Sequence, residues 1–189
     1  MISATFFFKL CQMKNYVYAD NAAATPIDDR VVSVMNETIQ LFANPSSIHQ
    51  LGTEARSRIN SAKAIVMRFL NAKPEDEIVF TSSGTESNNL AILGVAKANI
   101  ARGRHIITSK IEHPSVINAC RSLEKEGWKI TYLPVDQNGL VSELDLKKSL
   151  KKDTVLVSIN LANSELGVIQ NIRPLAQLAR KNSSYFHTD

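Results

Sequence analysis

The segment Thr81–Asn89 has residue types that could bind a phosphate group, and it links a predicted strand to a predicted helix. The N-terminus of a helix presents unpaired N–H groups and the positive end of the helix dipole, which favour a bound phosphate. Gly84 would let the backbone approach a ligand closely, and Thr85 adds a hydroxyl donor. The alternative is a capping box that runs from Ser83 to Glu86 and needs no ligand.

Two more polar segments follow apolar runs. His113 stands between a predicted strand and a predicted helix, where a neutral imidazole could stack on a flat ring or transfer a proton. Its alternative role is to cap the helix. The loop Asn160–Gly167, which contains Asn163 and Ser164, follows an apolar run typical of a buried strand. Its alternative is an Asx turn without a ligand.

Asp189 follows the last predicted strand. A carboxylate at the end of a strand can pair with a ring nitrogen of a cofactor, as in enzymes that use pyridoxal 5'-phosphate (PLP), where it keeps the ring protonated. The alternative is a surface aspartate in a turn.

The elements that would position these residues alternate along the chain. Strands separated by helices of about ten or more residues indicate a mainly parallel sheet covered by helices, an α/β fold. Ligands of such sheets bind at the carboxyl ends of the strands, where the polar segments fall. The expected strands are 16–19, 77–81, 105–108, 129–133, 154–159 and 184–187, and the expected helices are 29–42, 49–70, 85–101, 114–126, 144–150 and 172–180.

Composition is that of a globular protein, with 44% hydrophobic and 21% charged residues. The net charge of +4 is spread along the chain without interleaved aromatic residues, so we expect no nucleic-acid partner. Two cysteines, Cys11 and Cys120, form neither a disulfide framework nor a zinc motif, which favours the cytoplasm. We expect no membrane span, because the apolar start is too short. Neither a Walker A loop nor a dinucleotide fingerprint is present, which disfavours a nucleotide-binding domain.

From about Val17 to Asp189, the chain resembles the N-terminal half of cysteine desulfurases of the NifS/IscS type, in the class V aminotransferase group of PLP enzymes. The resemblance implies the large domain of the aminotransferase fold (fold type I), truncated. We expect an N-terminal extension over 1–15, a candidate for disorder, then a strand and helices over 16–70 and an incomplete PLP-binding domain over 71–189. The matching stretches are Tyr18–Pro26, Asn44–His49, Ile78–Leu90, His105–His113 and Asn163–Gly167.

The resemblance also implies roles for single residues. Gly84 and Thr85 match the pair that holds the cofactor phosphate. His113 matches the histidine that stacks on the pyridine ring and is implicated in proton transfer, and Asp189 matches the acid that pairs with the pyridine nitrogen. Ser164 departs from the pattern, because the family usually has an asparagine there that donates to the phenolic oxygen of the cofactor. Either a water bridge or Asn163 could take its place.

The activity implied is conversion of L-cysteine to L-alanine, with the sulfur passed to an enzyme cysteine for iron-sulfur clusters or tRNA thiolation. The lysine of the Schiff base and the nucleophilic cysteine lie downstream in the family, so we expect no turnover by this chain alone. Cys120 is expected in the core. Full-length relatives are expected to be homodimers that serve a sulfur-acceptor or scaffold protein. The alternatives are a non-catalytic remnant and another class V enzyme such as a selenocysteine lyase.

Overall fold

The computed structural model describes residues 17–189. The chain divides at Ile78 into two compact units, and the second runs from Val79 to Asp189. The expected N-terminal extension over residues 1–15 lies outside the described residues, as does Cys11.

The described part of the first unit, residues 17–78, contains two helices joined by irregular segments. The helix α2 (Asp29–Thr38) begins after Asp28, whose carboxylate accepts the Arg30 backbone N–H, and α3 (Gln50–Phe69) begins after His49. Near the start of α3, Gly52 allows a close approach to the preceding loop, because a Cβ there would lie 2.5 Å from the Ser47 carbonyl oxygen.

The helix α2 is shorter than the sequence pattern predicts, since it ends at Thr38 rather than near Phe42. Ile39 and Phe42 are 77% and 85% exposed. Extending the helix would therefore bury little apolar surface, and most helical stability comes from such packing.

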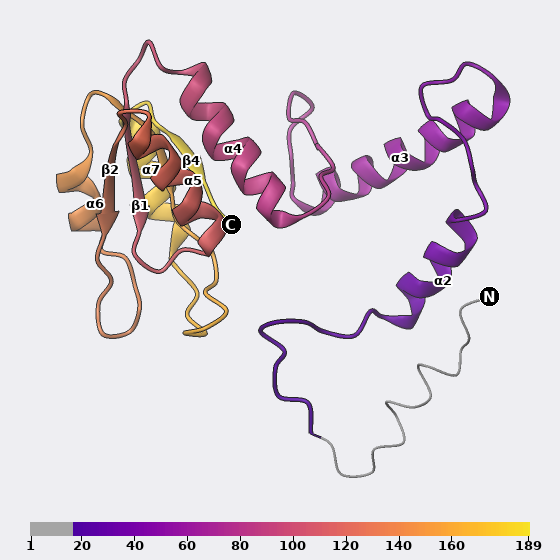
Figure 1. The fold of residues 1–189 in the computed structure, drawn as a ribbon, viewed down its shortest axis with the longest axis horizontal. Helices are drawn as coiled ribbons and strands as arrows, with labels where there is room; N and C mark the ends of the chain where they lie inside the picture. Colours follow the sequence, from indigo (N-terminus) through magenta and orange to yellow (C-terminus); the bar gives the residue numbers. More distant parts are fainter. Residues whose placement is uncertain (1–16) are drawn as a thin grey trace. The chain divides into compact units, whose positions relative to one another are not determined.

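The second unit carries a four-stranded parallel sheet in the order β2-β1-β3-β4. Between successive strands the chain passes through a helix, as the alternating pattern predicts (Figure 1). The elements are α4 (Gly84–Ala98), β1 (His105–Ser109), α5 (Pro114–Lys125), β2 (Lys129–Leu133), α6 (Glu143–Ser149), β3 (Thr154–Ser158), α7 (Ile172–Lys181) and β4 (Tyr185–His187).

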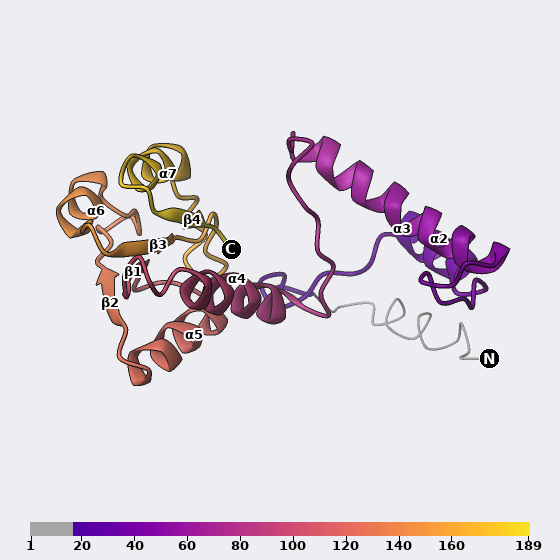
Figure 2. The same ribbon diagram turned by 90° about the horizontal axis from the view of Figure 1, so that it is seen from above.

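Helices cover both faces of this sheet, with α4 and α5 on one side and α6 and α7 on the other (Figure 2). Successive side chains of a strand point to opposite faces, so Ile106 packs in the cluster beneath α4 and α5, while Ile107 packs in the cluster beneath α6 and α7. Both strands at the centre of the sheet, β1 and β3, are buried along their whole length. This confirms the α/β fold and accounts for the uninterrupted apolar run of β3.

Two expected strands do not form. Residues 77–81 and the described part of 16–19, residues 17–19, are irregular, and Val79 and Phe80 are each 55% exposed. A strand is stable only beside another strand, which supplies partners for its backbone N–H and C=O groups. Within residues 17–189, the sheet consists of β1 to β4 and offers these segments no neighbour.

Helix ends differ from the expected ones by a few residues. The helix α4 stops at Ala98 rather than 101, because the Asn99 side chain and backbone both donate to the Val95 carbonyl. By contrast, α5 ends as predicted before Gly127, which has a φ of 84° that glycine adopts at little cost. None of the helices over residues 17–189 is both long and apolar enough to span a bilayer.

Candidate functional site

A cavity of about 380 Å³ lies at the carboxyl ends of β1, β3 and β4. From β1 the chain moves outward to β2 on one side and then to β3 on the other, so the strand order reverses between β1 and β3. Ligands of open parallel sheets bind in the crevice at such a switch point. The residues at this cavity that matter for its chemistry are Lys110, Glu112, His113, Asn160, Ser164 and Asp189.

Four of the predicted site residues therefore lie together, although they come from three different loops. His113 follows β1, Asn163 and Ser164 follow β3, and Asp189 follows β4. A backbone hydrogen bond beyond the ends of β3 and β4 positions Asp189, because the Leu161 backbone N–H donates to the Asp189 carbonyl at 3.0 Å.

His113 caps α5, the alternative considered for it, and it also lines the cavity. Its Nδ1 accepts the Ser115 backbone N–H at 3.2 Å and lies 2.7 Å from the Ser115 Oγ. The Ser115 Oγ in turn accepts the Asn88 side-chain amide at 2.9 Å, and both Asn88 and Ser115 are buried. The imidazole is therefore held through its Nδ1 edge.

Glu112, the neighbour of His113, is buried at the cavity with 7% of its surface exposed. Its Oε1 accepts from the Ser109 hydroxyl and from the Asn160 backbone N–H. Its Oε2 and the Oδ1 of Asn160 are buried acceptors without a partner among the described residues. Burial raises the pKa of the Glu112 carboxyl to about 7, and the nearby Asp189 charge adds to the rise.

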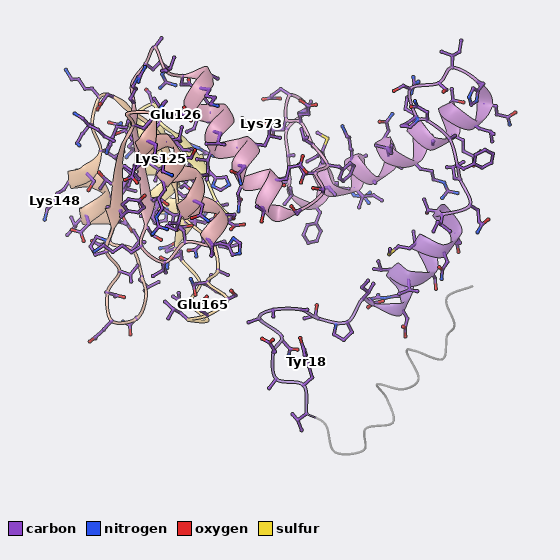
Figure 3. The ribbon with its side chains drawn as sticks, in the orientation of Figure 1. Tyr18, Lys73, Lys125, Glu126, Lys148 and Glu165 are labelled. Atoms are coloured by element: carbon purple, nitrogen blue, oxygen red, sulfur yellow. The ribbon has the colours of Figure 1, made fainter. Side chains whose placement is uncertain are left out.

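Asn163 and Ser164 differ in what their side chains already do. The Asn163 Nδ2 donates to the Ile111 carbonyl at 2.7 Å, and its Oδ1 accepts the backbone N–H groups of Glu165 and Leu166. The Oδ1 end thus forms the Asx turn considered as an alternative, while the Nδ2 end ties this loop to Ile111 in the loop after β1. Ser164 is exposed at the cavity. Glu165, the next residue, is labelled in Figure 3.

Gly84 and Thr85 do not line this cavity. They form the exposed first turn of α4, a 15-residue helix, and a Cβ at Gly84 would meet no atom within 4 Å. The Ser83 Oγ accepts the Glu86 backbone N–H at 3.2 Å, whereas the Glu86 carboxylate accepts from the backbone and hydroxyl of Ser82. The helix start is thus capped by the Ser83 side chain, whereas the space beside Gly84 is open.

Sequence reasoning missed three of these cavity residues, Lys110, Glu112 and Asn160. All three lie in segments that drew attention for other residues, and the available signal was a polar side chain within three residues of the end of a strand that is buried along its whole length. Among residues 17–189, no group of three or more His, Cys, Asp or Glu side chains could hold a metal ion.

Comparison with known proteins was made by sequence and by structure. Residues 17–189 match the family model for aminotransferase class V. The chain is 51% identical over 178 residues to the cysteine desulfurase IscS of Dictyoglomus turgidum, covering 94% of this chain and 45% of that protein. The chain thus spans less than half the length of this curated relative.

Solved structures agree with the sequence matches. A NifS-like protein superposes with a TM-score of 0.85 at 38% identity, over 89% of this chain and 47% of that one. A structure described as SspA in complex with cysteine superposes with a TM-score of 0.83 at 39% identity, over 89% of this chain and 48% of that one.

Proposed function

The chain belongs to the aminotransferase class V family, and from that premise we propose that it supplies the cofactor-facing half of a PLP-dependent cysteine desulfurase. The observation that carries the proposal is the cavity at the switch point, where His113, Ser164 and Asp189 meet from three loops. L-cysteine as substrate is supported by the names of the relatives and by the solved complex of SspA with cysteine.

The residues at the cavity fit the proposed cofactor. A protonated pyridine nitrogen needs an anionic acceptor, which the Asp189 carboxylate would provide. A hydroxyl or N–H group of a ligand would find acceptors in Glu112 Oε2 and Asn160 Oδ1, which are buried and lack partners among the described residues. PLP, when bound, supplies a ring that withdraws electrons from the substrate carbon next to the amino group.

Each of the proposed site residues would then have a separate role. Asp189 would accept from the protonated ring nitrogen, and the His113 imidazole would hold the flat ring and keep its Nε2 available for proton exchange. Ser164 provides a hydroxyl where the family has an amide, and Asn163 holds the loop that presents it. Gly84 and Thr85 receive the phosphate at the open first turn of α4, where backbone N–H groups and the helix dipole favour an anion.

No residue assigned here provides the covalent lysine anchor or the attacking thiolate. Cys120 lies on the buried face of α5, and burial raises its pKa to about 12, so its thiol is protonated at neutral pH. The expected behaviour of the 189-residue chain is binding of the cofactor without release of alanine or sulfide from cysteine.

Binding is best tested with pyridoxine 5'-phosphate alongside PLP. Pyridoxine phosphate has the ring and phosphate but no aldehyde, so it cannot react with Lys110, which lies at the cavity rim. Equilibrium dialysis should show binding of both compounds. Thr85→Val and Asp189→Asn should each weaken it about tenfold or more, because each removes a hydrogen bond to a charged group.

Thr53→Val is the matched control for Thr85→Val. Thr53 is also an exposed threonine in the first turn of a helix, and its hydroxyl bonds only within α3 and its cap. The proposal fails if the unchanged chain folds but binds neither compound, or if Thr85→Val and Thr53→Val bind equally well. Folded protein without binding would favour a non-catalytic role.

Partners and location complete the proposal. We propose that the full-length enzyme is a cytoplasmic homodimer that passes sulfur to an acceptor or scaffold protein and makes no direct contact with nucleic acid. The support is the type of enzyme named for the relatives. Size-exclusion chromatography with light scattering on the full-length protein tests the dimer.

A further inference from the structure

We propose that Asn88 is a positioning residue that acts through Ser115 to fix the tautomer of His113, with the ring proton on Nε2. The three residues form a chain of hydrogen bonds from the interior of α4 to the edge of the cavity. The use of this tautomer in proton transfer rests on the proposed function, whereas the tautomer itself does not.

The first step concerns His113 Nδ1. The Ser115 backbone N–H donates to it at 3.2 Å, and a backbone N–H can only donate. Nδ1 must therefore carry a lone pair, and in a neutral imidazole the proton then resides on Nε2.

The second step concerns the direction of the Ser115 hydroxyl. The Asn88 Nδ2 group donates to the Ser115 Oγ at 2.9 Å, and a side-chain NH₂ group has no lone pair to offer. The oxygen is thus the acceptor in that contact, and its single hydrogen is free to point at His113 Nδ1, 2.7 Å away. Asn88 and Ser115 are 4% and 6% exposed, so water does not compete for these groups.

The chain of hydrogen bonds from Asn88 through Ser115 to His113, called the relay below, directs two donors at His113 Nδ1. Moving the imidazole proton to Nδ1 would set it against the Ser115 backbone N–H and would force the Ser115 hydroxyl to turn its hydrogen away, so that tautomer loses the backbone hydrogen bond. The Nε2–H group remains as the donor that the exposed His113 ring offers to a ligand. Asn88 lies one helical turn beyond Gly84 and Thr85 on α4, so the helix proposed to receive the phosphate also sets the proton position on the imidazole.

The test is a two-bond ¹H–¹⁵N correlation spectrum of the 189-residue chain with ¹⁵N-labelled histidine, recorded without cofactor at a pH where the ring is neutral. His113→Gln identifies the signals. We expect a protonated Nε2 and an unprotonated Nδ1. A spectrum in which His113 is mainly protonated on Nδ1 would overturn the proposal, whatever the outcome of the cofactor-binding experiment.

Two variants test the relay itself. Asn88→Asp replaces the donor by an acceptor that takes the Ser115 hydroxyl hydrogen, and Ser115→Ala removes the hydroxyl but keeps the backbone donor. Each should raise the fraction of the Nδ1–H tautomer roughly three- to tenfold, since one donor to Nδ1 is lost. Ser115→Thr should restore the original fraction.

Asn89→Asp is the matched control, because Asn89 is the next residue of α4 and its side chain donates to the Thr85 carbonyl instead. It should leave the His113 tautomer unchanged. If Asn88→Asp does not fold, Ser115→Ala with its Thr counterpart decides the question. An unchanged tautomer in folded Ser115→Ala would show that the hydroxyl has no such role.

Discussion

The Glu112 carboxylate accepts the backbone N–H of Asn160 at 3.1 Å, and this bond joins the loop after β1 to the loop after β3. The same oxygen accepts the Ser109 hydroxyl at the end of β1. The loops after the two strands are thus joined at the switch point, and the second carboxylate oxygen is buried without a hydrogen-bond partner among the described residues.

The first prediction concerns Glu112 and pH. Its pKa is about 7 in the folded chain against an ordinary value of 4.5, so the folded state keeps a proton that the unfolded chain releases. The free energy of unfolding should therefore fall as pH rises from about 4.5 to 7, by at most roughly 1.4 kcal/mol per pH unit. Glu112→Gln keeps an acceptor for Ser109 and Asn160 but cannot titrate, so it should remove this decline.

Urea unfolding followed by tryptophan fluorescence measures the effect. Trp128 is the single tryptophan of the chain and is buried in the second unit, so its signal reports on the unit that holds Glu112. The difference between the two proteins should grow in favour of Glu112→Gln from pH 5 to pH 8. A constant difference over that range would contradict the assignment.

The second prediction concerns Ser164. The longer amide of Ser164→Asn should reach a ligand in the cavity better than the hydroxyl does, and asparagine is the residue that the resemblance implies at this position. We expect PLP and pyridoxine phosphate to bind several-fold more tightly, about 1 kcal/mol for one hydrogen bond. Ser164→Ala should bind no better than the unchanged chain. Dialysis in which all three proteins bind equally would remove Ser164 from the site.

The third prediction concerns Asn163, whose side chain makes two hydrogen bonds within its loop and one to the Ile111 carbonyl in the loop after β1. Asn163→Ala should lower the free energy of unfolding by about 2 kcal/mol, because the Ile111 carbonyl and two backbone N–H groups lose their partner. The control is Asn171→Ala, since Asn171 precedes α7 without making a side-chain capping bond. Equal effects of both changes in urea unfolding would argue against this role.

The fourth prediction concerns Cys120, whose pKa is raised to about 12 by burial. In a Cys11→Ser background at pH 8, a thiol reagent should modify Cys120 only as fast as the second unit opens. Modification should become complete in urea above the transition seen by Trp128 fluorescence. Rapid modification of the folded chain, at the rate of a free thiol, would place Cys120 outside the core.

The sequence was sufficient to predict the strands and helices of the second unit, because their apolar periodicity coincides with what the sheet buries. The pattern at Ile78–Phe80 is equally apolar, yet no strand forms there, since a strand depends on a neighbour that a local pattern cannot supply. The early end of α2 has the same origin, because its last apolar residues find little to pack against.

For the site, sequence order predicted which loops would meet but not which side chains would be free to act. Asn163 and Ser164 are adjacent and both polar, and only the coordinates separate the one that builds the loop from the one that lines the cavity. The relay from Asn88 to His113 spans 25 residues and depends on the packing of α4 against α5. No rule based on local residue spacing predicts that contact.

Over residues 17–189, the order of the sheet leaves β2 and β4 with one neighbouring strand each. Tyr185, in the three-residue β4, is 50% exposed. Exposed edge strands readily pair with further backbone, either from a segment of a partner or from another molecule in a concentrated solution. The solubility of this chain should therefore depend on whether another segment pairs with these two edge strands. A peptide designed to pair with β4 is a rational additive for preparing it.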